Sequence, residues 1–445
     1  MDVVALILAF TPLVGPLPHL ERAGAETRRF TPVSASQAAP YFAFATSSGV
    51  GMTAACACTS PTGTAGEVMT TSRGSSAYCS KAGLDKTGIE VGDLVSCGNA
   101  LPRIMPGTRG GTLGVMVENT ATNQATYSED FTHTSWADFA LGAAAPTRAA
   151  DQGTSPANTA TADRITFPAT TSGQYTMLAK TPAAGTETFS FYIKGVSGSG
   201  SIRICRRAGA PWVSETCSFN NTTWTRCVSG STTSLSVIYL GNSSTVATCG
   251  ASTDAMAEAD VYVWGAQTED NSLGYATTYV PALAGSAGSR SADVVSFQTG
   301  ISTAVGSFAV SVAPSWATVA DKPKVSPARF ILTRQSTNED TSASVASSLS
   351  LYCAAGTTGA GATDVYANVA RSSSTSRVSC FFDFGNVPVI GGAVDGSSMS
   401  IVDPTGASAR TAVTKFYIGS GSGTGEQIDA VVYNVCVDPV ITRCQ

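Results

Sequence analysis

The sequence predicts an all-β protein: tandem β-sandwich domains, jelly-roll-like in character, preceded by an extended N-terminal arm. Charged residues make up only 13% of the 445 residues, about half of the usual ~25% share. Short alternating segments, separated by turns rich in Gly, Ser and Asn, recur along the chain. No segment has a sustained helical period, and the Ala-rich stretch Ala137–Ala150 is interrupted at Pro146.

The first series of alternating segments predicts a jelly-roll-like domain, because strands at this spacing are typical of a sandwich. Its predicted strands are Thr188–Lys194, Ser201–Arg207, Trp224–Ser229, Ser234–Leu240 and Asp260–Gln267.

The small, poorly periodic stretch Pro281–Arg290 predicts a linker. A second series of strands follows it and predicts another sandwich. The strands of this series are Ser307–Val312, Ala328–Leu332, Ser348–Cys353, Val378–Phe384, Gly392–Val394, Ser398–Val402, Lys415–Ile418 and Gln427–Tyr433.

Four regions follow from this organisation, in keeping with the two or three domains that the length predicts. They are an apolar N-terminal attachment arm (1–30), a Cys-containing β-rich region (31–118), a jelly-roll module (119–290) and a second β-sandwich (291–445).

The N-terminal apolar run is too short to cross a membrane. Val3–Phe10 contains eight apolar residues, whereas a spanning helix needs about 20. The run resembles the core of a signal peptide, but Asp2 stands where a positive charge is expected. We expect an uncleaved arm that docks into a neighbouring subunit; a signal peptide is the alternative.

The twelve cysteines fall into even groups, which favours local disulfides formed outside the cell. The groups are Cys56, Cys58, Cys79 and Cys97; Cys205, Cys217, Cys227 and Cys249; Cys353 and Cys380; and Cys436 and Cys444. The first group could instead hold zinc, but its Cys-x-Cys start departs from the usual spacing. We expect no metal, and we expect Cys205 and Cys217 to staple the hairpin between them.

The charge pattern argues against two classes of partner. The net charge is −5 and no run of Lys or Arg is longer than Arg206-Arg207. Nucleic acids and anionic membranes both attract clusters of Lys and Arg, so neither is an expected partner.

Several ordered segments resemble a module of phage head-spike, head-fibre and tail-fibre proteins. They begin with a short lead-in and run through residues 101–295. The segments are Leu101–Ile104, Gly114–Glu118 (GVMVE), Tyr127–Trp136 (YSEDFTHTSW), Ser155–Phe167, Ser190–Lys194 (SFYIK), Val261–Glu269 (VYVWGAQTE), Tyr275–Pro281 (YATTYVP) and Ser289–Val295 (SRSADVV). Residues 296–445 resemble a concanavalin-like (laminin-G-like) lectin sandwich through Gly391–Ser400 and Phe416–Gly419.

The resemblance implies a virion structural protein, a surface fibre, spike or capsid decoration that adheres to glycans of the host surface. Its expected partners are other virion proteins, reached through the N-terminal arm, and further copies of the chain. The expected location is the virion surface. The alternatives are a tailspike with glycan depolymerase activity and a secreted bacterial adhesin.

No catalytic motif is present, and we expect neither enzymatic activity nor a cofactor. The chain has two histidines, His19 and His133, and lacks Gly-x-Ser-x-Gly, phosphate-loop and His-Glu-x-x-His patterns. We expect His133 to be structural or exposed. A depolymerase would need a carboxylate pair; the candidates are Glu129, Asp130, Glu269 and Asp270.

Sugars stack on exposed aromatic rings, so aromatic residues are the candidate glycan contacts. We expect Trp136 and Trp264 to lie in the core. Trp212, which follows the predicted turn at Ala208–Pro211, is the first candidate, and Trp224 and Tyr275 are the others.

Overall fold

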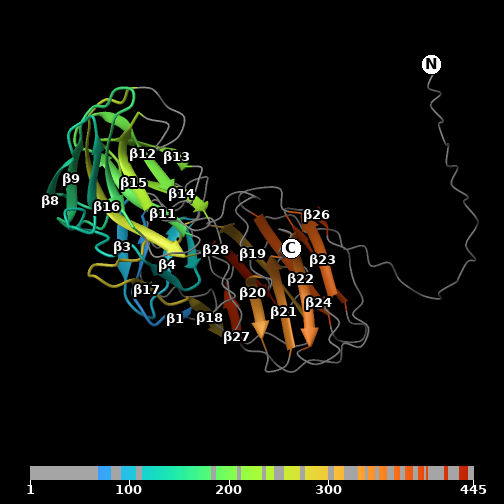
Figure 1. Ribbon diagram of the computed structural model, residues 1–445. Helices are drawn as coiled ribbons and strands as arrows, with labels where there is room; N and C mark the ends of the chain where they lie inside the picture. The colour runs from blue at the N-terminus through green and yellow to red at the C-terminus, as the bar shows by residue number, and fades with distance from the viewer. Residues whose placement is uncertain are drawn as a thin grey trace, which may run out of the picture.

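The computed structural model contains strands, turns and loops, with no helix among the residues that it describes, and hence none that could cross a membrane. These residues are 69–81, 92–106, 113–181, 187–207, 212–232, 237–244, 255–270, 276–298, 305–314, 329–335, 339–345, 350–357, 365–370, 376–383, 389–394, 397–398, 415–418 and 430–438. The N-terminal arm lies outside them. The all-β prediction is confirmed, and Figure 1 shows two β-structured bodies beside each other.

The first body is a sandwich of two antiparallel sheets. The five-stranded sheet has the order β13 (Trp212–Asn220), β12 (Ser199–Arg207), β15 (Val237–Ser243), β10 (Tyr175–Lys180), β7 (Ala137–Leu141). The facing sheet, called here the β16 sheet, contains β14 (Thr225–Thr232), β11 (Glu187–Gly195), β16 (Ala259–Asp270), β6 (Ala121–Asn123) and β17 (Gly288–Arg290), with β9 (Ala162–Phe167) also on β16 and β8 (Thr147–Gly153) on β9.

The order of strands confirms the jelly-roll prediction. One sheet contains the run β9-β16-β11-β14 and the other the run β10-β15-β12-β13. Successive strands therefore cross between the sheets, except at the β12–β13 hairpin, which is the arrangement of a jelly roll.

The second body is also built from two antiparallel sheets. The β20 sheet has the order β1 (Thr70–Ser72), β18 (Val294–Gln298), β27 (Lys415–Ile418), β20 (Arg329–Gln335), β21 (Glu339–Val345), β22 (Ser350–Thr357), β23 (Val365–Ala370). The β28 sheet has the order β26 (Ser397–Ser398), β25 (Val389–Val394), β24 (Ser376–Asp383), β19 (Val305–Pro314), β28 (Ala430–Asp438), β5 (Leu113–Val117), β4 (Arg103–Pro106).

The region before the jelly roll supplies strands to both bodies. β1 extends the β20 sheet through β18, and β5 extends the β28 sheet through β28. The hairpin of β2 (Ala77–Ser80) and β3 (Leu94–Cys97) instead packs on the jelly roll, where Tyr78 and Leu94 contact Trp264 and Tyr279. The N-terminal strands, blue in Figure 1, lie where the two bodies meet.

The stretch predicted to be a linker, Pro281–Arg290, is held against the jelly roll. Gly288–Arg290 forms β17 and pairs with β6. Ala282 and Arg290 are buried. The backbone is so close here that a Cβ at Gly288 would lie 1.8 Å from the carbonyl oxygen of Pro281. Its small residues therefore serve close packing.

Strand β16 carries apolar side chains on both faces, as its sequence predicts for a central strand. Val261 and Val263 belong to the core between the two jelly-roll sheets. Trp264 packs on the other face, in an aromatic cluster with Tyr192 and Tyr279. Trp136 and Trp264 are both fully buried, which confirms the expected core roles.

The predicted hairpin staple is wrong, because Cys217 is bonded to Cys227. Register explains the difference: Cys205 lies opposite Ser214, and Cys217 lies opposite Ile202. Cys217 faces the core between the sheets, whereas Cys205 packs in a separate cluster. The observed disulfide joins the edge strands β13 and β14, one from each sheet.

Cys79, Cys97, Cys205 and Cys380 are also disulfide-bonded. The sulfur atoms of Cys79 and Cys97 are 3.7 Å apart, so these two are not bonded to each other. None of the cysteines that the structure describes is free. The disulfide interpretation is thus confirmed for these residues; Cys56, Cys58, Cys249 and Cys444 lie outside the described ranges.

We expect the double substitution Cys217→Ala, Cys227→Ala to lower the free energy of unfolding by about 3 kcal/mol, because a loop of this size loses its covalent closure. Denaturant unfolding followed by tryptophan fluorescence measures the change. Ser218→Ala, an exposed change on the same strand, is the control. Equal midpoints for the double variant and wild type would contradict the prediction.

Candidate functional site

Side chains from three of the motif segments, together with Arg73, meet in a buried ion-pair network. We define it as Arg73, Arg103, Glu118, Arg290 and Asp293. Arg103 donates to Glu118 at 2.7 Å and also pairs with Asp293, whereas Arg73 pairs with Asp293 at 2.6 Å and Arg290 with Glu118 at 2.9 Å. All five side chains are at most 2% exposed.

Thr278 supplies the remaining hydrogen bonds to Glu118. Its backbone N–H and its hydroxyl donate to the two carboxylate oxygens at 2.8 and 2.6 Å. The backbone of Glu118 also exchanges bonds with Asp293: its N–H donates to the Asp293 carboxylate, and the Asp293 N–H donates to its carbonyl. Buried charges persist when they are paired and hydrogen-bonded in this way.

The network has a strong electrostatic effect on Glu118. Burial by itself raises the pKa of a carboxyl group, but Arg290 and Arg103, helped by Thr278, lower the pKa of Glu118 to about 2. Burial likewise acts against the charge of Arg103, and its two carboxylate partners outweigh it and raise the Arg103 pKa. Glu118 and Arg103 therefore both remain charged at neutral pH.

The network lies between the two bodies. Arg103 is on β4, and Glu118 follows β5, both at the edge of the β28 sheet. Arg290 is on β17 in the jelly roll, and Asp293 immediately precedes β18 in the β20 sheet. The network therefore links the two bodies through ion pairs.

The Tyr127–Trp136 loop has a similar structural role. The Ser128 hydroxyl lies 2.8 Å from the Tyr279 hydroxyl, which also donates to Glu129. The Asp130 carboxylate accepts from backbone N–H groups of its own loop. Trp136 donates its indole N–H to the carbonyl of Tyr127. The loop is thereby closed on itself and on the jelly roll.

The candidate catalytic groups also make their contacts within the fold. His133 stacks on Tyr127 with ring centroids 3.4 Å apart and accepts from the Ser135 N–H. Glu269 is buried and accepts from the N–H and hydroxyl of Thr277, and burial raises its pKa despite these bonds. The side chain of Asp270 lies outside the described residues. No group in the described part of the chain is arranged to hold a metal ion.

Of the three predicted glycan contacts, the structure describes the side chain of Trp224 alone. Trp224 is only 7% exposed, within the aromatic cluster of Tyr192 and Trp264, and the ammonium group of Lys194 lies 5.8 Å from its ring. This position leaves little ring surface for a sugar. Trp212 begins β13, with its side chain outside the described residues, and Tyr275 lies outside them altogether. Their glycan binding stays a prediction.

Sequence reasoning missed an aromatic cluster on the outer face of the five-stranded sheet. Phe139 and Tyr175 stack with centroids 4.6 Å apart, and Tyr239 lies 4.6 Å from Phe139. Met177 packs with them, whereas the next residue, Leu178, faces the inter-sheet core. The alternation of Tyr175 and Met177 with Thr176 and Leu178 was the available signal.

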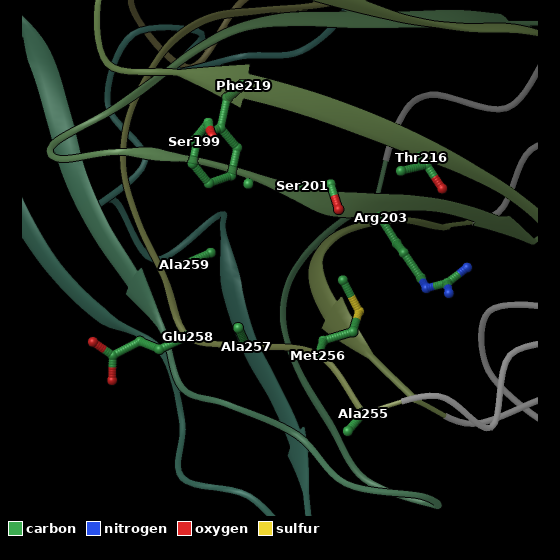
Figure 2. Close-up of a pocket in the computed structure, with 11 residues that line it drawn as sticks. Ser199, Ser201, Arg203, Thr216, Phe219, Ala255, Met256, Ala257, Glu258 and Ala259 are labelled. Carbon is green, nitrogen blue, oxygen red and sulfur yellow. The ribbon is translucent and has the colours of Figure 1, made fainter.

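A pocket of about 340 Å³ opens on the same body, beside β12 and β13. Its walls come from those two strands and from the segment 255–259 that leads into β16. Figure 2 shows Met256 reaching toward the side chains of β12, and Glu258 directed away from the pocket. The lining residues are Ser199, Gly200, Ser201, Arg203, Thr216, Phe219, Ala255, Met256, Ala257, Glu258 and Ala259.

No family model and no curated protein matches the sequence. Among the solved structures that match is one of domains LG4-5 of the mouse laminin alpha1 chain, 13% identical, covering 67% of this chain and 92% of that chain with a TM-score of 0.22. A TM-score this low does not establish a shared fold. The resemblances to the phage module and to the lectin sandwich therefore stay predictions.

We expect Arg103→Met to lower the free energy of unfolding by about 3–5 kcal/mol, because it leaves buried carboxylates short of a partner. Arg164→Met removes an exposed pair with Asp260 and should lower the free energy of unfolding far less, because solvent screens an exposed pair. Differential scanning calorimetry of both variants measures the difference. Equal losses would show that the network does not fasten the fold.

The Glu118 contribution to stability should depend on pH. The pKa of this group is 4.5 ordinarily and about 2 in the fold, so its contribution is full above pH 4.5 and falls as the pH drops through 2. The difference in free energy of unfolding between wild type and Glu118→Gln should therefore become smaller as the pH falls from 4.5 to 2. Denaturant unfolding at a series of pH values measures it.

Asp163 provides the contrast in sign. Burial raises its pKa to about 6, against hydrogen bonds from Asp151 and Phe131, so its protonation between pH 6 and 3.8 favours the folded state. The stability of Asp163→Asn relative to wild type should therefore fall as the pH falls through this range. For Glu118, the prediction would be contradicted if the difference in free energy of unfolding between wild type and Glu118→Gln grew as the pH fell.

Proposed function

We propose that this chain is a non-enzymatic structural protein of a virion surface, a fibre or spike subunit or a capsid decoration, that displays its β-sandwiches for adhesion to host glycans. The observation that carries the proposal is that charged residues of the motif segments have a structural role. One buried ion-pair network contains Arg103, Glu118, Arg290 and Asp293. The segments that carry the family resemblance thus fasten domains together.

The surface chemistry supports display outside a cell. Few charges, disulfides and two sandwiches favour resistance to unfolding. The ion-pair network joins the jelly roll to the second body, which would help to present a binding face at a fixed orientation. The N-terminal run Val3–Phe10 is the proposed attachment to other virion proteins.

Immuno-electron microscopy tests the location, with an antiserum raised against the purified full chain. The proposal expects labelling at fixed positions on intact particles. Loss of residues 1–18 should abolish incorporation while the truncated chain still folds. Incorporation at normal occupancy without these residues would remove the arm from the proposal, and protein found only in the medium would favour a secreted adhesin.

A depolymerase activity would overturn the non-enzymatic part of the proposal. Incubation of the chain with capsular polysaccharide should leave the viscosity unchanged. A fall in viscosity that is lost in Glu129→Gln, and retained in Asp138→Asn on the exposed edge strand β7, would identify a tailspike enzyme instead.

A further inference from the structure

We propose that the pocket beside β12 and β13 binds a sugar that carries a carboxylate, with Arg203 as the group that receives the negative charge. This inference rests on the proposed adhesive function and gives it a location and a ligand class. The pocket is a site separate from Trp212, whose glycan binding stays a prediction.

Arg203 is available to a ligand. Its only hydrogen bond to a described residue is a long one, 3.4 Å, from one terminal nitrogen to the Ser214 hydroxyl. Its Nε is buried without a partner. Within the described ranges no carboxylate pairs with it. Its neighbour on the same strand, Arg206, differs in being paired with Glu215 at 2.8 Å.

A guanidinium group with unused donors is the side chain best suited to a carboxylate, because its planar fork matches the two oxygens. Glu258, the acidic residue of the lining, is exposed and directed away from the pocket (Figure 2). The pocket thus has a local positive group although the whole chain is acidic.

The remaining lining suits the rest of a sugar ring. Ser199, Ser201 and Thr216 offer hydroxyls for exchange with sugar hydroxyls, and the half-buried Met256 thioether offers apolar surface for its C–H face. A volume of about 340 Å³ lies at the small end of the range for ligand pockets. One or two sugar units fit this size.

The wall opposite β12 is held in place before any ligand arrives. Met256 exchanges two backbone hydrogen bonds with Thr170, both 2.9 Å. Its sulfur accepts the Ser243 N–H at 3.2 Å. Phe219 belongs to the inter-sheet core. A prearranged wall limits the loss of conformational entropy on binding.

Isothermal titration calorimetry of the full chain tests the site with two matched probes. One is a tetrasaccharide of alternating glucuronate and N-acetylglucosamine; the other is the same molecule with its carboxyl groups reduced to alcohols. We expect the acidic probe to bind at least tenfold more tightly. Arg203→Gln should abolish this preference, and Arg203→Lys should restore part of it.

Two further variants make the result specific. Lys81→Gln removes an exposed positive charge that lies on β2–β3, outside the pocket, and should keep the wild-type preference. Ser201→Phe fills the pocket and leaves its charge unchanged, so it should weaken the binding of both probes. This variant provides the test if Arg203→Gln does not fold. Equal binding of the two probes, no binding of the acidic probe, or an equal loss in Lys81→Gln would overturn the proposal.

Adhesion and calorimetry together distinguish a failure of the proposed site from a failure of the proposed function. If particles carry the chain and adhere to cells, but Arg203→Gln particles adhere equally well, the site is wrong and the function stands. If no particle carries the chain, the proposed function fails, whereas the calorimetric preference still decides the pocket.

Discussion

The pairing of Arg103 with Glu118 and Asp293 is the interaction on which the arrangement of the protein depends. A buried guanidinium group needs both carboxylates, and these lie far apart in the sequence. Glu118 follows a strand of the β28 sheet, and Asp293 precedes a strand of the β20 sheet. Meeting at one arginine fixes where the chain leaves and re-enters the second body on either side of the jelly roll. Buried ion pairs add less to stability than apolar packing of the same volume would, but breaking one is costly. The network therefore specifies geometry more than it adds free energy.

This constraint also explains the path of the N-terminal region. Arg73 reaches the same aspartate, so β1 is held beside β18. The β2–β3 hairpin then covers the aromatic face of the jelly roll that β11 and β16 present. Without that cover, Tyr192, Trp264 and Tyr279 would form an exposed apolar patch of the kind that promotes association. One segment thus completes the sheets of one sandwich and covers the outer face of the other.

The inner face of the five-stranded sheet serves stability, and recognition is what we propose for its outer side. The inner face buries Leu178 and Ile204 against the β16 sheet. The outer side carries the Phe139 cluster and, near β13, the Arg203 pocket. The charged motif residues Arg103, Glu118, Arg290 and Asp293 lie elsewhere, in buried positions. Substitutions on the sheet surface can therefore alter a binding site and leave the fold unchanged.

Alternation and turn composition are local properties, and they were enough to predict the fold class, several of the strands and the core roles of Trp136 and Trp264. They did not predict β10, β13, β21 or β23. Only the tertiary structure decided which elements join. Cys217 pairs with Cys227 and not with Cys205, since strand register places Cys205 and Cys217 on opposite faces. The predicted linker became β17 for a related reason: its small residues permit close backbone contact that composition does not reveal. The pocket depends on β12, β13 and the approach to β16 being neighbours in space. Contacts between distant segments depend on register and topology, which no local pattern encodes.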